Sequence, residues 1–189
     1  MAEDTDQQLV DRVLGGNKGA FDLLVLRYQH RVAALIGRFI LDAQEVEDVS
    51  QEAFIKAYRA LPSFRGDSAF YTWLYRIVVN TAKNHLVSRS RRPPVSDIEV
   101  DEAVVSDIGN ALREIENPEG NLATVKLKEA IKTAIEELPE DLRTALTLRE
   151  FSGLSYEDIT EVMDCPVGTV RSRIFRAREV IDKKIQELL

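Results

Sequence analysis

The segment 154–179, LSYEDITEVMDCPVGTVRSRIFRARE, constrains the fold more than any other part of the chain. Ser155 followed by Asp158 predicts the start of a helix, because the serine oxygen can accept a backbone N–H that lacks an intrahelical partner. Asp164-Cys165-Pro166 then predicts a break before a second helix, with Cys165 interpreted as a small packed residue in the turn. Two short helices joined by a tight turn are typical of a helix-turn-helix.

The second helix of this motif has two unlike faces. At 100° per residue, the apolar side chains form one stripe, predicted to be buried: Val170, Ile174, Ala177 and Ile181. The opposite arc carries Arg171, Ser172, Phe175 and Arg176, and Arg173 and Arg178 lie at its borders, where their heads can reach phosphates. Arginine can read a guanine edge, and a ring can contact a thymine methyl. The pattern favours a DNA-reading helix; the alternative is a solvated arginine face that forms salt bridges to its own acidic domain.

The rest of the chain is divided into helices by glycine and proline. We expect helices near residues 5–15, 18–40, 44–61, 68–91, 124–138, 140–151, 155–163 and 167–187. The fold class is therefore all-α, with two small helical domains at 1–92 and 125–189. Between them, residues 93–124 hold one Lys/Arg and eight Asp/Glu and no aromatic residue, which predicts an acidic linker. This linker accounts for the net charge of −7, so the acidic total does not argue against a local DNA-binding surface.

Aromatic residues concentrate at 64–75, FRGDSAFYTWLY, which holds five of the thirteen in the chain. On the helix that follows, Tyr71, Leu74, Val78 and Ala82 define an apolar side. The candidate residues for unpaired bases are Phe64, Trp73, Tyr75, Arg76, Asn80, Lys83 and Asn84. Stacking a base on an aromatic ring contributes about 1–3 kcal/mol, and the loop 64–68 can hold a base rotated out of the duplex. The alternative is that the rings fill a core: this is our interpretation of Tyr71, and the choice stays open for Phe70 and Tyr75. Arg65-Gly66-Asp67 is interpreted as a turn.

The helix near 44–61 presents a third surface. Its apolar residues point one way, and the reverse face carries Asp48, Gln51, Glu52, Ile55 and Arg59. An exposed isoleucine ringed by charges of both signs indicates a patch for docking another protein.

Several classes of protein are disfavoured by what the sequence lacks. It has no phosphate-binding glycine loop and no nucleophile motif, so we do not expect an enzyme. One cysteine, with His30 and His85, gives no disulfide and no metal-ligand cluster, and no cofactor is indicated. No stretch is apolar enough to span a bilayer, so we expect a cytoplasmic chain without membrane insertion. A dimeric repressor or activator would need a dimer seam, and no heptad run is visible. A helical interaction module without DNA contact is argued against by the arginine face.

Two blocks of the sequence resemble the extracytoplasmic-function sigma factors, especially their sigma-E envelope-stress branch. The blocks are residues 45–84, EVEDVSQEAFIKAYRALPSFRGDSAFYTWLYRIVVNTAKN, and residues 138–179, LPEDLRTALTLREFSGLSYEDITEVMDCPVGTVRSRIFRARE. They cover nearly half of the chain. Ser50 stands where such proteins often have an aliphatic residue, but it falls on the packed side of its helix.

The resemblance implies a sigma-two domain (1–92) followed by a sigma-four domain (125–189). The first would bind core RNA polymerase through the 44–61 helix and would recognise and melt the minus-ten element, with Phe64 and Asn80 capturing a flipped base. The second would read the minus-thirty-five element of promoter DNA through Arg171, Ser172, Phe175 and Arg176. The acidic linker would thread the nucleic-acid channels of the polymerase. A membrane-anchored anti-sigma protein is the expected inhibitor.

Overall fold

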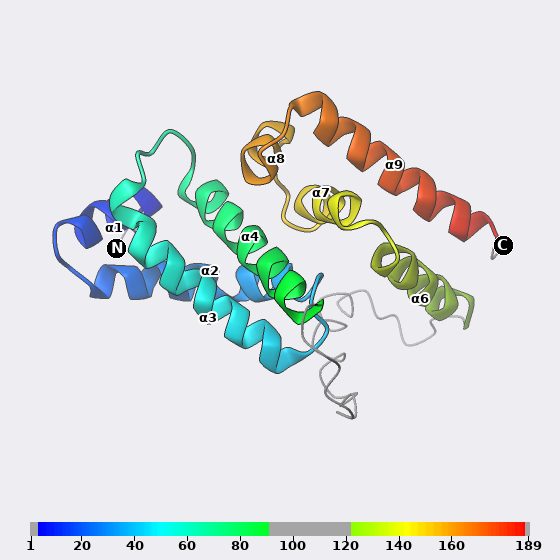
Figure 1. The fold of residues 1–189 in the computed structure, drawn as a ribbon, viewed down its shortest axis with the longest axis horizontal. Coiled ribbons are helices and arrows are strands. Elements are labelled where there is room, and N and C mark those ends of the chain that lie inside the picture. The colour runs from blue at the N-terminus through cyan, green and yellow to red at the C-terminus, as the bar shows by residue number, and fades with distance from the viewer. Residues whose placement is uncertain (1–3, 91–121, 188–189) are drawn as a thin grey trace. The chain divides into compact units, whose positions relative to one another are not determined.

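The computed structural model describes residues 4–90 and 122–187 (Figure 1). These residues fall into two compact units, one on each side of the segment 91–121. The described residues form helices and turns and no strand, which confirms the all-α prediction. Most of the predicted linker lies outside the described residues; its last part, 122–124, belongs to a helix that begins earlier than expected.

The first unit contains α1 (Asp6–Leu14), α2 (Gly19–Ile36), α3 (Ala43–Ala60), the 3-10 turn η1 (Leu61–Ser63) and α4 (Phe70–Ser90). Two of these helices begin at side-chain caps. Thr5 accepts a hydrogen bond from the backbone N–H of Gln8, and Asp42 accepts one from Glu45 at 2.8 Å. Gly16, with a φ of +95°, lies in the turn that follows α1.

The core of this unit forms where α3 packs against both α2 and α4, and α1 packs against α2. It is built from apolar side chains at helical spacing: Leu9, Val10, Leu24, Val32, Ile36, Val49, Phe54, Leu61, Phe70, Leu74, Val78 and Ala82. Helix α2 ends at Ile36, four residues before the predicted end. The chain turns at Gly37, and Phe39 and Ile40 are buried although they lie outside the helix. From the sequence alone, this apolar run was interpreted as a continuation of the helix.

The second unit contains α6 (Leu122–Glu136), α7 (Glu140–Glu150), α8 (Tyr156–Met163) and α9 (Val167–Gln186). Helix α9 packs against the other three, so it is supported along much of its length. The core side chains are Ala134, Leu138, Ala145, Leu146, Leu148, Leu154, Ile159, Val162, Val170, Ile174 and Ala177. These boundaries agree with the helices predicted from glycine and proline to within a few residues.

Within 4–90 and 122–187, no helix combines the length and the apolar character that crossing a bilayer requires. Nor do the described residues contain a group of three or more His, Cys, Asp or Glu side chains placed to hold a metal ion.

Candidate nucleic-acid interface

Helices α8 and α9 form the helix-turn-helix that the sequence predicted. The Ser155 hydroxyl oxygen accepts the Asp158 backbone N–H at 3.0 Å, and Asp158 in turn accepts the Ser155 backbone N–H at 3.2 Å. Asp164 ends α8 with a φ of +50°, a left-handed conformation that Asp tolerates better than most residues. Cys165 is half-buried in the turn, and α9 begins two residues later. The caps and the turn therefore fix the angle at which α9 leaves the motif.

The two faces of α9 lie as the periodicity predicts. Val170, Ile174 and Ala177 are buried, and Ile181 is half-buried. The opposite arc is exposed along its whole length: Arg171, Ser172, Phe175 and Arg176. Phe175 is 62% exposed, which is unusual for a phenylalanine and leaves its ring available to a partner. The helix thus presents cations, a hydroxyl and an apolar ring on one accessible surface.

The four arginines of α9 are not equivalent. The Arg173 guanidinium donates to an Asp141 carboxylate oxygen at 2.6 Å and to the Cys165 sulfur at 3.3 Å. Arg178 pairs with Glu150, and this hydrogen bond raises the pKa of Arg178 above its ordinary value. The sequence placed both heads where they can reach phosphates, whereas the structure joins both to carboxylates of α7. The alternative of salt bridges to the chain's own acids is therefore correct for these two.

The other two arginines have different surroundings. The Arg171 guanidinium lies over the Tyr156 ring, 5.6 Å from its centroid, and Arg149 lies over the same ring at 4.8 Å. Arg149 also donates to the Leu154 carbonyl at 2.7 Å. Arg176 is exposed and forms no salt bridge within the described ranges. Sequence reasoning missed Tyr156 and Arg149, although an aromatic residue beside the Ser155 cap was a signal that a ring would flank the start of α8.

Three rings of the first unit form what we call the ring cluster: Phe64, Phe70 and Trp73. Their centroids are 5.1 to 6.0 Å apart, in edge and tilted arrangements that aromatic pairs favour. Phe70 is buried and forms the base of the cluster, whereas Phe64 and Trp73 are half-buried. Trp73 is therefore less exposed than predicted, because it rests on the other two rings. Both half-buried rings keep accessible surface.

Tyr75 requires a correction. It was a candidate for stacking on bases, but it is 3% exposed and lies in the core, where burial raises the pKa of its hydroxyl. The reason is that α4 packs against both α2 and α3, which buries a wider arc than the predicted apolar side. Tyr75 follows Tyr71 by one helical turn, and the two rings meet edge to face at 6.3 Å. Tyr71 itself is half-buried. We therefore leave Tyr75 out of the DNA-facing surface.

A polar arc of α4 continues from the ring cluster. Arg76, Asn80 and Asn84 are exposed and Lys83 is half-buried, so the predicted polar arc of α4 lies at the surface. The loop before α4 turns at Gly66, whose φ of +72° suits glycine, and Arg65 pairs with Asp67 at 3.0 Å across it. This geometry confirms that the triplet is a turn. The ring cluster thus lies at the start of α4, and the amide and cationic side chains follow it along one side of the helix.

The outward face of α3 is exposed as the sequence predicted. Its members are Asp48, Gln51, Glu52, Ile55 and Arg59, and Ile55 is 50% exposed. The opposite side is buried through Val49, Ala53, Phe54 and Ala57. Ser50 lies beside the packed side, where its hydroxyl donates to the Val46 carbonyl at 2.6 Å. The serine therefore satisfies its own polar group and leaves the outward face unchanged.

Comparisons with known proteins match both units. The Sigma-70 region 2 family model matches residues 24–92, and the Sigma-70, region 4 family model matches residues 128–181. The RNA polymerase sigma-H factor of Pseudomonas aeruginosa is 64% identical over 189 residues, covering 100% of this chain and 98% of that protein. The ECF RNA polymerase sigma-E factor of Escherichia coli K12 is 63% identical over 185 residues, covering 98% of this chain and 96% of that protein.

Two solved structures share the fold. CnrH, in a complex with the cytosolic domain of CnrY, aligns with a TM-score of 0.71 at 24% identity and covers 97% of this chain and 99% of its own. The sigma factor RpoE of Bartonella quintana, in a complex with the anti-sigma factor NepR, aligns with a TM-score of 0.65 at 23% identity, covering 88% of this chain and 96% of its own.

Proposed function

The chain belongs to the extracytoplasmic-function sigma factors of bacterial RNA polymerase, and on this premise we propose how its two helical units share the recognition of a promoter. It binds core polymerase and directs promoter recognition and transcription initiation in an envelope-stress response. Members of this family are regulatory DNA-binding proteins rather than enzymes. We propose further that this chain has no catalytic activity and that it acts in the cytoplasm, where polymerase and promoter DNA lie.

The second unit, which contains the predicted domain 125–189, reads the minus-thirty-five duplex with α9. The observation that carries this proposal is the exposure of Arg171, Ser172, Phe175 and Arg176 on one arc of a helix whose other side is buried. A helix of this kind fits the major groove, where arginine reads guanine and an apolar ring meets a thymine methyl. The guanidinium groups of Arg173 and Arg178 are each paired with a carboxylate of α7, which offsets part of the charge that they can offer to a phosphate.

The first unit, within residues 1–92, recognises and opens the minus-ten element. Phe64 and Trp73 offer ring surface for an unstacked base, and Asn80 and Asn84 offer amide groups that can read a base edge. Arg76 and Lys83 supply positive charge along the same arc for the strand backbone. Opening a duplex requires a surface that compensates for lost pairing, and stacking on these rings provides it.

The outward face of α3 docks the unit on core polymerase. Ile55 supplies an apolar centre, and Asp48, Gln51, Glu52 and Arg59 supply a polar rim, as in many protein interfaces. Docking also explains how weak readers suffice. One α-helix offers only a few base contacts of about 1–3 kcal/mol each. Holding both readers on one polymerase makes the second contact effectively intramolecular.

An anti-sigma protein anchored in the membrane is the proposed inhibitor. The solved relative from Bartonella quintana was captured with an anti-sigma factor, which supports a partner of this class. The acidic linker of residues 93–124 is proposed to occupy the nucleic-acid channels of the polymerase. It carries eight Asp/Glu and one Lys/Arg, so its negative charge suits channels that accept nucleic acid.

Run-off transcription with purified core polymerase tests the proposal. On a library of promoters, we expect the chain to direct initiation from a defined set, and Arg176→Ala to lose about 1–3 kcal/mol of discrimination at the minus-thirty-five element. Binding of the variant to core polymerase is expected to be unchanged, because Arg176 lies in the other unit from α3. Equal loss of polymerase binding, or tight and specific duplex binding by the free chain, would contradict the assignment.

A further inference from the structure

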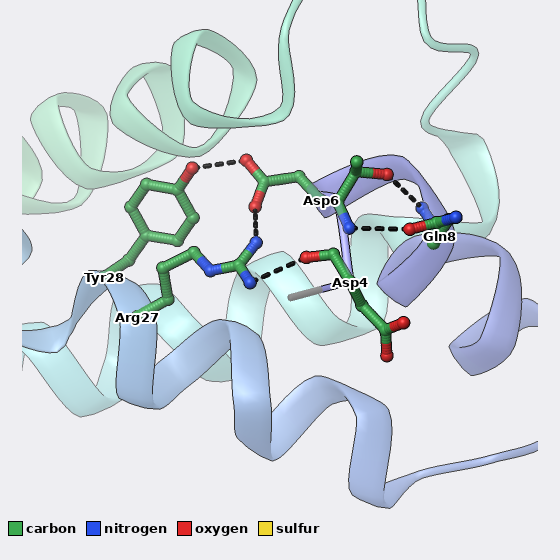
Figure 2. A network of polar contacts seen from close by, with 6 residues as sticks. Asp4, Asp6, Gln8, Arg27 and Tyr28 are labelled. Carbon is green, nitrogen blue, oxygen red and sulfur yellow. Dashed lines mark hydrogen bonds and ion pairs between the residues drawn. The ribbon is translucent and has the colours of Figure 1, made fainter. Parts of the chain in front are cut away.

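A compact network of polar contacts joins the first turn of α1 to α2 (Figure 2). One oxygen of the Asp6 carboxylate accepts a hydrogen bond from the Arg27 guanidinium at 2.5 Å, and the other accepts one from the Tyr28 hydroxyl. Arg27 also donates to the backbone carbonyl of Asp4 at 2.8 Å. We call Asp6, Arg27 and Tyr28 the α1 anchor. Its three members bring α1 and α2 together from positions more than twenty residues apart.

The anchor leads directly to the ring cluster. The Tyr28 ring is buried and lies 5.7 Å from the ring of Phe70, centroid to centroid. Phe70 in turn supports both Phe64, at 6.0 Å, and Trp73, at 5.7 Å. The hydrogen bond of the Tyr28 hydroxyl therefore fixes the first ring in a series of contacting rings. The last rings of this series, Phe64 and Trp73, form the surface proposed to receive a base. Because interiors are close-packed, a shift of Tyr28 is transmitted to the rings that rest on it.

A second contact runs from the same turn of α1 to the loop before α4. A Cβ atom built at Gly66 would lie 3.6 Å from the side-chain oxygen of Gln7, so the two residues are neighbours. Helix α1 also packs against η1, which begins the connection to this loop. The first turn of α1 thus borders the proposed base site on two sides, through the rings and through the loop.

We infer that Asp6 and Tyr28 are positioning residues that set the orientation of Phe64 and Trp73 for the displaced minus-ten base. The inference rests on the proposed function of the first unit. Neither residue is offered as a contact to DNA: Tyr28 is 4% exposed, and Asp6 has a negative charge that would repel a phosphate. Their effect is to hold the ring cluster in the shape that accepts a base, so that less ordering remains to be done when the strand opens.

The chemistry of the bond suits a constant brace. Burial, followed by the hydrogen bond to Asp6, raises the pKa of Tyr28 well above its ordinary value. The phenol therefore keeps its proton throughout the range in which the protein works and remains a donor to Asp6. A hydrogen bond to a charged acceptor is stronger than one between neutral groups, which favours a single orientation of the ring.

Trp73 allows the first half of the test, because it is the only tryptophan in the chain. We expect Asp6→Asn and Tyr28→Phe each to change the emission maximum or the quenching of Trp73 in the full-length chain, at a temperature where circular dichroism shows native helix content. Asp22→Asn is the matched control, since it removes an exposed carboxylate from the first turn of α2, the helix that carries Arg27 and Tyr28. Emission that is unchanged in both variants, or changed equally in the control, would overturn the inference.

The second half uses the holoenzyme and a forked DNA whose minus-ten strand is unpaired. We expect each variant to weaken binding to this fork about five-fold, which is the scale of residues that act through a contact network. The reference is the binding of the same variant to a fork that lacks the unpaired strand. Because Tyr28→Phe removes one of the two hydrogen bonds that Asp6→Asn weakens, the double variant is expected to lose little more than Asp6→Asn alone. If the losses multiply, or if neither variant binds more weakly, the inference fails.

The proposed function fails separately. If the wild-type holoenzyme shows no preference for the unpaired minus-ten strand, the first unit does not capture bases, whatever the variants do. If it shows the preference and Asp6→Asn reduces it while Asp22→Asn does not, both the function and the positioning role are supported. Tyr28→Phe keeps the test decisive if Asp6→Asn proves unstable, because it retains the ring against Phe70.

Discussion

The two surfaces proposed to face DNA differ in how they are connected to the core. On α9, the proposed contact groups are two arginines, a serine and a phenylalanine that are all exposed, and the apolar stripe on the opposite side of the helix carries the packing. In the ring cluster, the proposed contact rings of Phe64 and Trp73 are half-buried and rest on Phe70, which belongs to the core. A duplex already presents its edges in the groove, so a rigid helix with projecting side chains suffices. A base taken out of the stack needs a surface that replaces its stacking partner, and only rings that are held from behind provide one.

This difference predicts how mutations separate. On α9, stability and reading are carried by different residues, so each can be lost without the other. In the ring cluster they are carried by the same residues, so reading cannot be removed without some cost in packing.

The largest effect is expected from Ile174→Ala on the buried stripe of α9. Truncating a fully buried isoleucine costs about 2–5 kcal/mol of unfolding free energy, because it removes apolar burial and leaves a cavity. Denaturant unfolding, together with calorimetry, measures the loss of unfolding free energy. The control is Phe175→Ala, one residue along and 62% exposed, which is expected to change stability by less than about 0.5 kcal/mol while still weakening minus-thirty-five binding. Comparable destabilisation by both variants would break the comparison.

Trp73→Ala is expected to be next. It removes a stacking surface worth about 1–3 kcal/mol to an unpaired base, and also part of the ring cluster. Binding of holoenzyme to single-stranded minus-ten DNA measures the first effect, and thermal unfolding of the full chain measures the second. Both are expected to fall together, unlike the separable losses on α9. Unchanged stability beside a large loss of strand binding would show that the ring is a detached contact.

Matched helix caps give the third prediction. Thr5 and Gln8 form a capping box on α1, and Ser155 and Asp158 form one on α8. Thr5→Ala and Ser155→Ala are each expected to cost about 1 kcal/mol. Because the two boxes lie in different units, the first is expected to weaken minus-ten strand binding and the second minus-thirty-five duplex binding. Holoenzyme binding to each of the two DNA elements is measured for both variants. An effect of either variant on both elements would contradict the assignment of one element to each unit.

The smallest effect is expected at the salt bridge between Arg178 and Glu150. Glu150→Gln frees the guanidinium and is expected to raise affinity for minus-thirty-five DNA by about 0.2–1 kcal/mol, the scale of an exposed ion pair. Salt titrations of duplex binding check the sign, since an added phosphate contact steepens the salt dependence. Glu161→Gln, which removes another exposed carboxylate of the unit, controls for net charge. An equal gain from both would mean that Arg178 makes no specific contact.

The sequence predicted most of the fold because its signals are local. Helical spacing placed Val170, Ile174 and Ala177 on the buried side of α9, and a glycine or proline marked nearly every break. The outward face of α3 followed from the same periodicity. The errors concern residues at the edge of a helix face, where helical spacing alone does not decide whether a side chain is buried. Tyr75 was misassigned because α4 packs against two helices, which buries a wider arc than one stripe would suggest.

Contacts between helices could not be read from the sequence. Arg173 finds its carboxylate thirty-two residues away and Arg178 finds its own twenty-eight away, through the crossing of α7 and α9. The bond between Asp6 and Tyr28 likewise depends on how α1 meets α2. Periodicity fixes which side of a helix a residue occupies, but the partner opposite it is set by packing angles. The candidate residues were therefore largely predictable, whereas their supports were not.

Run-off transcription on two templates tests the division of labour most directly: a normal promoter, and the same promoter with the minus-ten region already unpaired by mismatches. Holoenzymes carrying Trp73→Ala and Arg176→Ala are compared with the wild type on both. We expect the unpaired template to restore much of the Trp73→Ala activity, because the cost of opening is removed, and to leave the Arg176→Ala defect as large as before. Restoration of both variants, or of neither, would contradict the account.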